Sequence, residues 1–106
     1  MQYRCWKSMP ARPPRDRHLI LDLQHLLTFT TVVNTGTFTR AAAELGYSQS
    51  SVTYQIQLLE RRLGLSLFKR SRFARIVLTE AGRRVLEHAE RLLALAEEMK
   101  AAIYTE

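Results

Sequence analysis

The sequence predicts a mainly helical domain in which three short helices and a two-stranded hairpin are followed by one long helix. Apolar residues recur at intervals of three and four residues in four separate segments, and a glycine directly follows each of the first three. Two extended apolar runs flank a short basic segment between the third and fourth helices. The chain has 106 residues, of which 46% are apolar and 25% charged, and this composition is typical of a single globular domain.

Residues 1–18 are predicted to form a disordered, basic extension. They include all three prolines and four of the arginines, and apolar residues do not recur there at regular spacing. This segment lacks the apolar stretch of a secretory signal, and the chain has no run of about 18 apolar residues that could span a membrane. We therefore expect a cytoplasmic protein without membrane contact.

Two short helices are predicted to begin a compact domain over residues 19–79. In the first helix, Asp22 can cap the N-terminus and Gly36 can end the last turn. Its inward-facing residues recur at helical spacing: Leu23, Leu26, Leu27, Thr30 and Val33. The second helix follows Thr37, which can cap it, and ends at Gly46 after a run of alanines.

A third helix is predicted to run from about residue 49 to residue 63, and it has one apolar and one polar side. Its buried stripe repeats at intervals of four, three and four residues: Val52, Ile56, Leu59 and Leu63. At about 100° per residue, the opposite side is formed by polar and basic residues and has no carboxylate. Its members are Ser50, Tyr54, Gln57 and Arg61, with Thr53 beside them. The helix opens on four small polar residues, of which Ser48 alone suffices as the N-cap. We therefore expect the polar side to be a hydrogen-bonding surface.

A basic hairpin and a long helix follow. Apolar runs on both sides of residues 71–75 predict two short strands, with basic residues on the rising strand and at the tip: Lys69, Arg70, Arg72 and Arg75. Residues 80–106 are predicted to form a linker helix, whose apolar stripe alternates steps of four and three: Val85, Ala89, Leu92, Ala96, Met99 and Ile103. Three short helices cannot cover so long a stripe, so we expect it to join two copies of the chain.

Positive charge is concentrated in part of the chain. The net charge is +6, and residues 61–84 carry eight basic residues against one acidic residue. From residue 85 onward the balance reverses, with two basic and five acidic residues. This asymmetry favours a polyanion as the partner of one face.

Together, these elements predict a winged helix-turn-helix that binds double-stranded DNA. In this fold the N-terminal end of the third helix enters the major groove, where small polar side chains allow close approach and free backbone N–H groups attract phosphate. We expect Gln49 to contact adenine, and Ser51 to contact a phosphate or a base edge. The ring of Tyr54 either contacts a thymine methyl group or lies flat on the helix. The predicted DNA-binding residues are Gln49, Ser50, Ser51, Thr53, Tyr54 and Gln57, with Arg40, Arg70, Arg72 and Arg75.

The sequence also resembles a known family. The segment FTRAAAELGYSQSSVTYQIQLLERRLGLSLFKR, followed by LTEAG, is similar to the DNA-binding part of LysR-type transcriptional regulators, and the similarity extends from about Leu21 to the end of the chain. The family pattern Ser-Gln-x-x-Val-x-x-Gln-Ile, which opens the recognition helix, falls on Ser48, Gln49, Val52, Gln55 and Ile56. The family pattern Leu-Phe-x-Arg falls on Leu67, Phe68 and Arg70.

The resemblance implies a homodimer joined through the linker helix, acting on sites with imperfect two-fold symmetry that are often rich in A and T. Tyr54 departs from the family, which often has Arg there, so the base preference at this position does not carry over. The hairpin is one residue longer than usual, so the family's basic wing residue falls on Arg72 or Arg75. Family members normally continue into an effector-binding domain. We therefore expect a small-molecule effector to act only through a domain that this chain lacks, or regulation to come from a partner.

Other classes of function fit the sequence less well. An enzyme is not expected, because no histidine lies near a candidate nucleophile and Cys5 lies in the N-terminal extension. No cofactor or metal site is predicted, since the three histidines lack the spacing of metal ligands. Two alternatives remain: another winged-helix regulator, such as the molybdate-responsive type, and a protein-interaction module built on the long helix.

Overall fold

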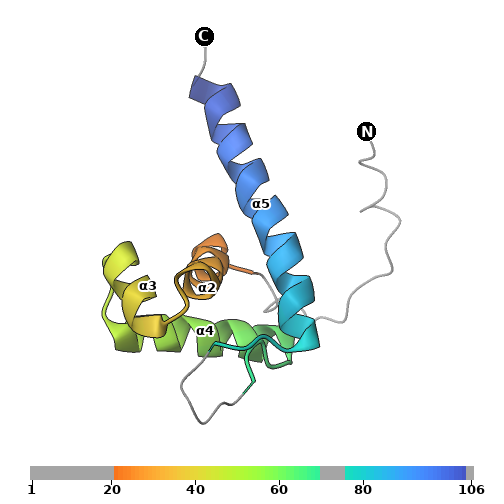
Figure 1. Cartoon of the computed structure of the whole chain (residues 1–106). Helices are drawn as coiled ribbons and strands as arrows, with labels where there is room; N and C mark the ends of the chain where they lie inside the picture. Colours follow the sequence, from red (N-terminus) through yellow and green to blue (C-terminus); the bar gives the residue numbers. More distant parts are fainter. Residues whose placement is uncertain (1–20, 70–75, 105–106) are drawn as a thin grey trace.

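The computed structural model describes residues 21–69 and 76–104, and these ranges contain four helices (Figure 1). They are α2 (Leu23–Thr35), α3 (Phe38–Leu45), α4 (Gln49–Leu63) and α5 (Glu80–Tyr104). All four predicted helices are therefore confirmed, with bounds close to those expected. The predicted N-terminal extension lies outside the described residues.

The helix ends follow from local hydrogen bonding. Asp22 accepts a hydrogen bond from the backbone N–H of Gln24 at 2.9 Å, and Thr37 accepts one from Arg40 at 3.0 Å. Each cap satisfies a backbone N–H group that has no partner within its helix. Between α3 and α4, Gly46 adopts φ of 78°, a conformation that side chains other than glycine rarely tolerate, and this residue ends α3 sharply enough for α4 to start three residues later.

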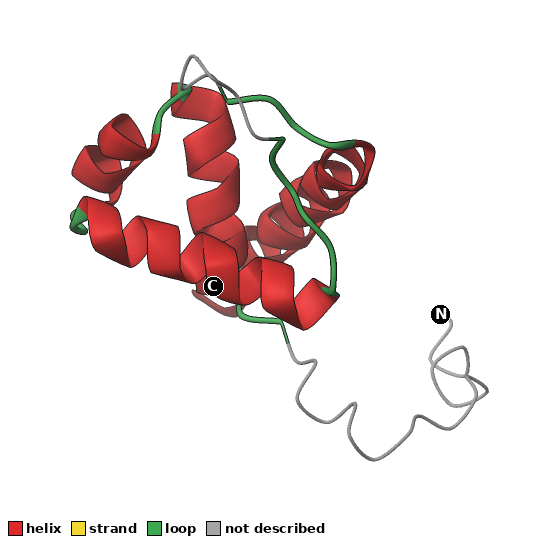
Figure 2. Ribbon diagram, turned by 90° about the horizontal axis from the view of Figure 1, so that it is seen from below, coloured by secondary structure: helices red, strands yellow, loops and turns green. Residues whose placement is uncertain are grey.

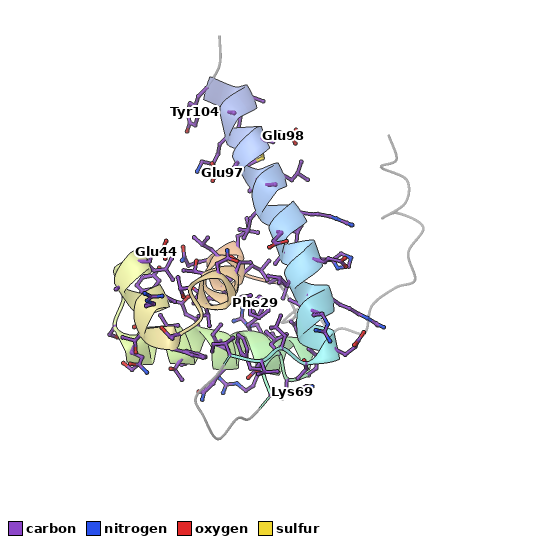
Figure 3. The ribbon with its side chains drawn as sticks, in the orientation of Figure 1. Phe29, Glu44, Lys69, Glu97, Glu98 and Tyr104 are labelled. Atoms are coloured by element: carbon purple, nitrogen blue, oxygen red, sulfur yellow. The ribbon has the colours of Figure 1, made fainter. Side chains whose placement is uncertain are left out.

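The core lies where the helices meet. Phe29 of α2 is fully buried at its centre (Figure 3), and its ring lies 5.5 Å from the ring of Phe68 in the loop after α4. Phe38 of α3 contacts Phe68 from another side, with ring centroids 5.8 Å apart. The other buried apolar residues are Leu26, Val32, Ala41, Ala42, Val52, Ile56, Leu59, Leu67 and Ala89. The inward stripe of α4 is thus confirmed for its first three members, while Leu63 is only partly buried.

A buried polar contact also fixes α4 on α2. The hydroxyl group of Thr28, which is fully buried, donates a hydrogen bond to the side-chain oxygen of Gln55 at 2.5 Å. A buried hydrogen bond between side chains restricts the rotation of one helix against the other, because an unpaired polar group there would be costly. Gln55 is therefore a structural residue, and the face of α4 opposite the apolar stripe points away from α2.

Of the predicted two-stranded hairpin, the described residues show one bridge and no longer strand. Within residues 21–69 and 76–104, the pairing is limited to one antiparallel bridge between Phe68 and Leu78, with the Lys69 N–H donating to the Val77 carbonyl at 2.8 Å. The two facing segments are short, and some of their backbone groups bond to neighbouring helices instead of to each other. The Thr79 carbonyl, for example, accepts from the Arg83 N–H of α5. The N–H of Leu67 donates to the carboxylate of Glu60 at 2.8 Å instead of to a facing strand. The predicted hairpin tip, residues 71–75, lies outside the described residues.

Helix α5 begins against the core and then leaves it. Thr79 caps the helix by accepting a hydrogen bond from the Gly82 N–H at 2.8 Å, while its hydroxyl donates to the Ser66 carbonyl at 2.6 Å. Gly82 is buried, and a Cβ atom there would lie 2.2 Å from the Leu67 carbonyl oxygen. The first turns of α5 therefore pack closely against the loop after α4, whereas its second half stands clear of the other helices (Figure 1).

Candidate nucleic-acid interface

Helix α4 presents one side that no other helix covers. In the view from below, α4 lies in front of the other three helices (Figure 2). Gln49, Ser50, Tyr54 and Gln57 are exposed there, and Thr53 and Ser51 are half-buried. Tyr54 is 57% exposed, so its ring is not part of the core. The structure thus brings together all six residues that were predicted on this helix.

The charge of this face is not balanced by carboxylates. Glu60 is the single acidic residue of α4, and its side chain is bound to the Leu67 N–H at the end of the helix. Arg61 in the last turn is exposed. Because the outer face of α4 carries no free carboxylate, nothing on it would repel a negatively charged partner.

The N-terminus of α4 is held by a small cluster of hydroxyl groups. Ser48 accepts a hydrogen bond from the Ser51 N–H at 3.1 Å, which confirms its predicted role as the N-cap. Its hydroxyl also lies 3.2 Å from the hydroxyl groups of Ser50 and Ser51. In the described part of the chain, the N–H groups of Gln49 and Ser50 have no acceptor. Two free donors at the positive end of a 15-residue helix are well suited to bind a phosphate oxygen.

Sequence reasoning missed one residue next to this cluster. The hydroxyl group of Thr39, in the first turn of α3, donates a hydrogen bond to the side-chain oxygen of Gln49 at 3.0 Å. No pattern in the sequence predicts this contact, because it depends on the angle at which the turn after Gly46 sets α4 against α3. The amide group of Gln49 is therefore anchored from outside its own helix.

The predicted basic residues are only partly within the described structure. Arg40 is exposed on α3, and Lys69 is exposed after the end of α4. Lys69 lies beneath the helices near the Phe68–Leu78 bridge (Figure 3). The predicted contacts Arg70, Arg72 and Arg75 lie outside the described residues, so their positions stay a prediction.

The apolar stripe of α5, predicted as one dimer surface, divides into two parts. Ala89 is buried in the chain's own core, so it is not free to contact a second chain, and Val85 is partly buried against that core. Beyond them the helix is exposed, with Leu92 at 43%, Met99 at 57% and Ile103 at 63%. Ala96 is half-buried. The available surface thus begins about two turns later than expected, because the base of α5 packs on α2.

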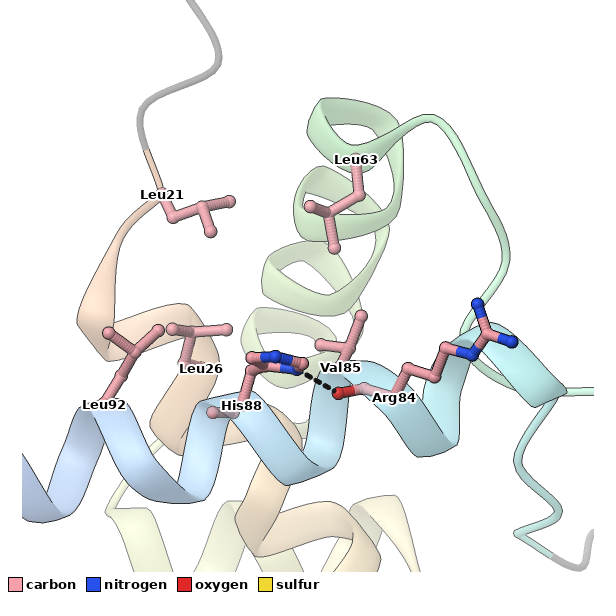
Figure 4. Close-up of a pocket in the computed structure, with 8 residues that line it drawn as sticks. Leu21, Leu26, Leu63, Arg84, Val85, His88 and Leu92 are labelled. Carbon is pink, nitrogen blue, oxygen red and sulfur yellow. Dashed lines mark hydrogen bonds between the residues drawn. The ribbon is translucent and has the colours of Figure 1, made fainter. Parts of the chain in front are cut away.

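An apolar groove of about 220 Å³ lies where the two parts of the stripe meet (Figure 4). Leu26 of α2 and Leu92 of α5 face it, and Leu21 and Leu63 close it on other sides. His88 borders the groove with its Nδ1 atom 2.9 Å from the Arg84 carbonyl oxygen. A change at Leu92 therefore affects packing within the protomer as well as the exposed part of α5.

The described residues form neither a membrane-spanning helix nor a cluster of metal ligands. None of the helices in the described ranges combines the length and hydropathy needed to cross a membrane. Within the same ranges, no three His, Cys, Asp or Glu side chains are grouped so that they could hold a metal ion.

Known proteins resemble this chain in both sequence and structure. It is 44% identical over 82 residues to the HTH-type transcriptional regulator YwqM of Bacillus subtilis, and 42% identical over 73 residues to the regulator CfxR of Cupriavidus necator. These alignments cover 77% and 69% of this chain, but only 28% and 23% of the two relatives. The chain therefore spans about a quarter of the length of the curated relatives that it matches. Their names describe transcriptional regulators and not enzymes.

Solved structures of DNA complexes share the fold. The DNA-binding domain of CbnR in complex with DNA superposes with a TM-score of 0.72 at 38% identity, covering 77% of this chain and 93% of that domain. The DNA-binding domain of BenM with benA site 1 DNA gives 0.73 at 32% identity, covering 78% and 92%. The family model for bacterial regulatory helix-turn-helix proteins of the lysR family matches residues 23–83, more than half of the chain. The chain belongs to the LysR family of bacterial helix-turn-helix regulators.

Proposed function

We propose that this chain binds double-stranded DNA sequence-specifically, as the DNA-binding part of a bacterial transcriptional regulator. The observation that carries the proposal is the outer face of α4, which is polar, free of carboxylates and uncovered by other helices. A face of this kind at a helix N-terminus matches the base edges and phosphates of the major groove. The DNA complexes of CbnR and BenM support the same role.

In this proposal, the residues of α4 divide into base contacts and phosphate contacts. Gln49 and Tyr54 read base edges, because an amide offers a donor and an acceptor to adenine and an aromatic ring can cover a thymine methyl group. Ser50, Ser51, Thr53 and Gln57 place the helix in the groove through hydroxyl and amide contacts. Phosphate contacts on the flanks come from Arg40 and from a basic wing that includes Arg70 and either Arg72 or Arg75.

The regulator acts as a homodimer joined through the exposed half of α5, and two copies of α4 then read two half-sites of a nearly symmetric operator. Residues 80–106 serve as the linker helix, and effector binding belongs to a further domain. The exposed apolar side chains between Leu92 and Ile103 support this assembly, because a monomer rarely leaves a continuous apolar stripe in water.

Selection of bound duplexes from a random pool tests the proposal. We expect a consensus of two inverted half-sites with A·T pairs where α4 docks, and an affinity that falls steeply as salt rises. Enrichment of a single, asymmetric element would favour a different winged-helix arrangement, such as the molybdate-responsive type. The absence of any enriched sequence, together with binding that does not respond to salt, would favour a protein-interaction module and overturn the proposal.

The substitution Gln49→Ala should remove a base contact. We expect it to cost about 1 to 3 kcal/mol on the selected duplex and much less on a duplex of unrelated sequence, because only the former offers the matching base edge. Fluorescence anisotropy at fixed salt measures both values. Gln57→Ala is a control further along the same face, where we expect a smaller and less selective loss. Equal losses on both duplexes would show that Gln49 contacts the backbone only.

The substitution Arg70→Ala should remove a phosphate contact. All sequences present the same phosphates, so we expect the affinity for every duplex to fall by a similar factor and the salt slope to become shallower by roughly one unit. Titrations at several salt concentrations measure the slope. A loss restricted to the selected duplex would mean instead that Arg70 reads a base.

A further inference from the structure

The hydrogen bond between Thr39 and Gln49 joins the two helices of the helix-turn-helix at their outer surface. Thr39 lies in the first turn of α3 and Gln49 opens α4, and both side chains are exposed. The Thr39 Oγ1 donates to the Gln49 Oε1 at 3.0 Å. The Thr37 cap holds the first turn of α3 and the Ser48 cap holds the first turn of α4, so both partners lie on ordered backbone.

This bond has a chemical consequence for the amide of Gln49. The last torsion of a glutamine side chain is broad and nearly two-fold, so a free amide exchanges its oxygen and nitrogen ends easily. In the orientation observed, the oxygen accepts from Thr39 and the nitrogen directs its two donors elsewhere. A threonine hydroxyl can donate or accept, so the bond fixes where the amide lies rather than which end faces Thr39. The oxygen has a second lone pair, so it can still accept from one further donor.

We infer that Thr39 is a positioning residue that sets the base specificity of Gln49. In the major groove adenine offers an acceptor and a donor side by side, whereas guanine offers two acceptors. An amide held there in the orientation observed can match the adenine pattern, whereas an amide that Thr39 does not hold can also move and aim both donors at guanine. The inference rests on the proposed DNA binding through Gln49, and it adds a residue that need not touch DNA itself.

Two substitutions separate the hydroxyl group of Thr39 from its shape. Thr39→Val keeps the branched side chain and removes the donor, whereas Thr39→Ser keeps the donor. On the selected duplex we expect Thr39→Val to bind about 3- to 10-fold more weakly, which is the range for loss of one hydrogen bond, and Thr39→Ser to stay near the parent protein. We also expect Thr39→Val to lose a similar factor of discrimination when the A·T pair that Gln49 reads is replaced by G·C.

A purely structural role for Thr39 predicts a different result. If Thr39 only stabilised α3, Thr39→Val would lower the unfolding temperature and weaken binding to selected and unrelated duplexes alike. We expect instead an unchanged unfolding temperature and unchanged binding to unrelated DNA. Weakening of both duplexes by the same factor would overturn the inference.

Comparison with Gln49→Ala distinguishes failure of this inference from failure of the proposed function. If Gln49→Ala leaves discrimination between A·T and G·C intact at every position, the proposed contact of Gln49 is wrong and the role of Thr39 falls with it. If Gln49→Ala abolishes discrimination at one position and Thr39→Val does not reduce it, the contact stands and the inference is wrong. In the Gln49→Ala background, we expect Thr39→Val to have no further effect, since coupled residues are not additive.

Discussion

Gly82→Ala should destabilise the fold by roughly 1 to 3 kcal/mol or more, as measured by the free energy of unfolding in denaturant. The added Cβ atom would lie 2.2 Å from the Leu67 carbonyl oxygen and 3.1 Å from a methyl group of Leu78, and the oxygen belongs to the backbone, which cannot rotate away. Helix propensity alone would favour alanine over glycine by about 1 kcal/mol, so the two effects have opposite signs. We expect the steric effect to dominate because the contact is far inside van der Waals distance.

Gly36→Ala is the matched control for this prediction. A Cβ atom at Gly36 would meet no atom within 4 Å, but the residue has φ of 89°, so the cost there is the backbone strain of about 1 to 2 kcal/mol without any clash. A Gly82→Ala protein as stable as the parent would contradict the prediction. It would mean that the loop around Leu67 shifts at little cost to admit the methyl group.

Leu92→Glu and Met99→Glu should each convert the dimer into monomers at micromolar concentration. Both substitutions place a carboxylate in the apolar interface that two α5 helices are proposed to form, and burial of an unpaired charge there is strongly unfavourable. Sedimentation velocity measures the change. Leu92 also lines the groove beside Leu26, so Leu92→Glu is expected to lower the protomer's stability as well. Met99, which is 57% exposed and lies beyond the groove, tests assembly alone.

Ala94→Glu is the control for the dimer prediction. Ala94 is exposed on the same helix but on the side opposite Ala96 and Met99, so the same new charge stays in water and the dimer should persist. A Met99→Glu protein that still sediments as a dimer would move the assembly to another surface. Monomers formed by Ala94→Glu would mean that α5 is surrounded by partner helices on all sides.

The elements that the sequence predicted well are those with local causes. The helix bounds depend on caps and glycines within a few residues, such as Ser48 at the start of α4 and Gly64 at its end, and both are visible in the sequence. The exposed polar face of α4 was predicted because its apolar residues recur at helical spacing on the opposite side. Of the two predicted strands, the described residues show one antiparallel bridge, between Phe68 and Leu78. The Leu67 N–H donates to Glu60, seven residues away, and not to a facing segment.

The details that the sequence could not predict depend on how helices cross. In the sequence, Ala89 is one more member of the periodic stripe that was predicted to join two chains. The structure shows that it is buried in the core of its own chain. The contact of Thr39 with Gln49 likewise requires the angle between α3 and α4. Both features are contacts between different helices, and such contacts cannot be predicted from hydrophobic periodicity or from helix caps.

The anchoring of α5 at Gly82 and Ala89 makes the rest of that helix a lever arm. About fifteen residues extend from the last buried turn to Tyr104, a length of roughly 22 Å at 1.5 Å per residue. A rotation of about 10° at the anchored base would move the far end by roughly 4 Å, close to the rise of one base pair along DNA. In the proposed dimer, small changes in packing at Leu67 or Leu78 would therefore change the distance between the two DNA-binding domains.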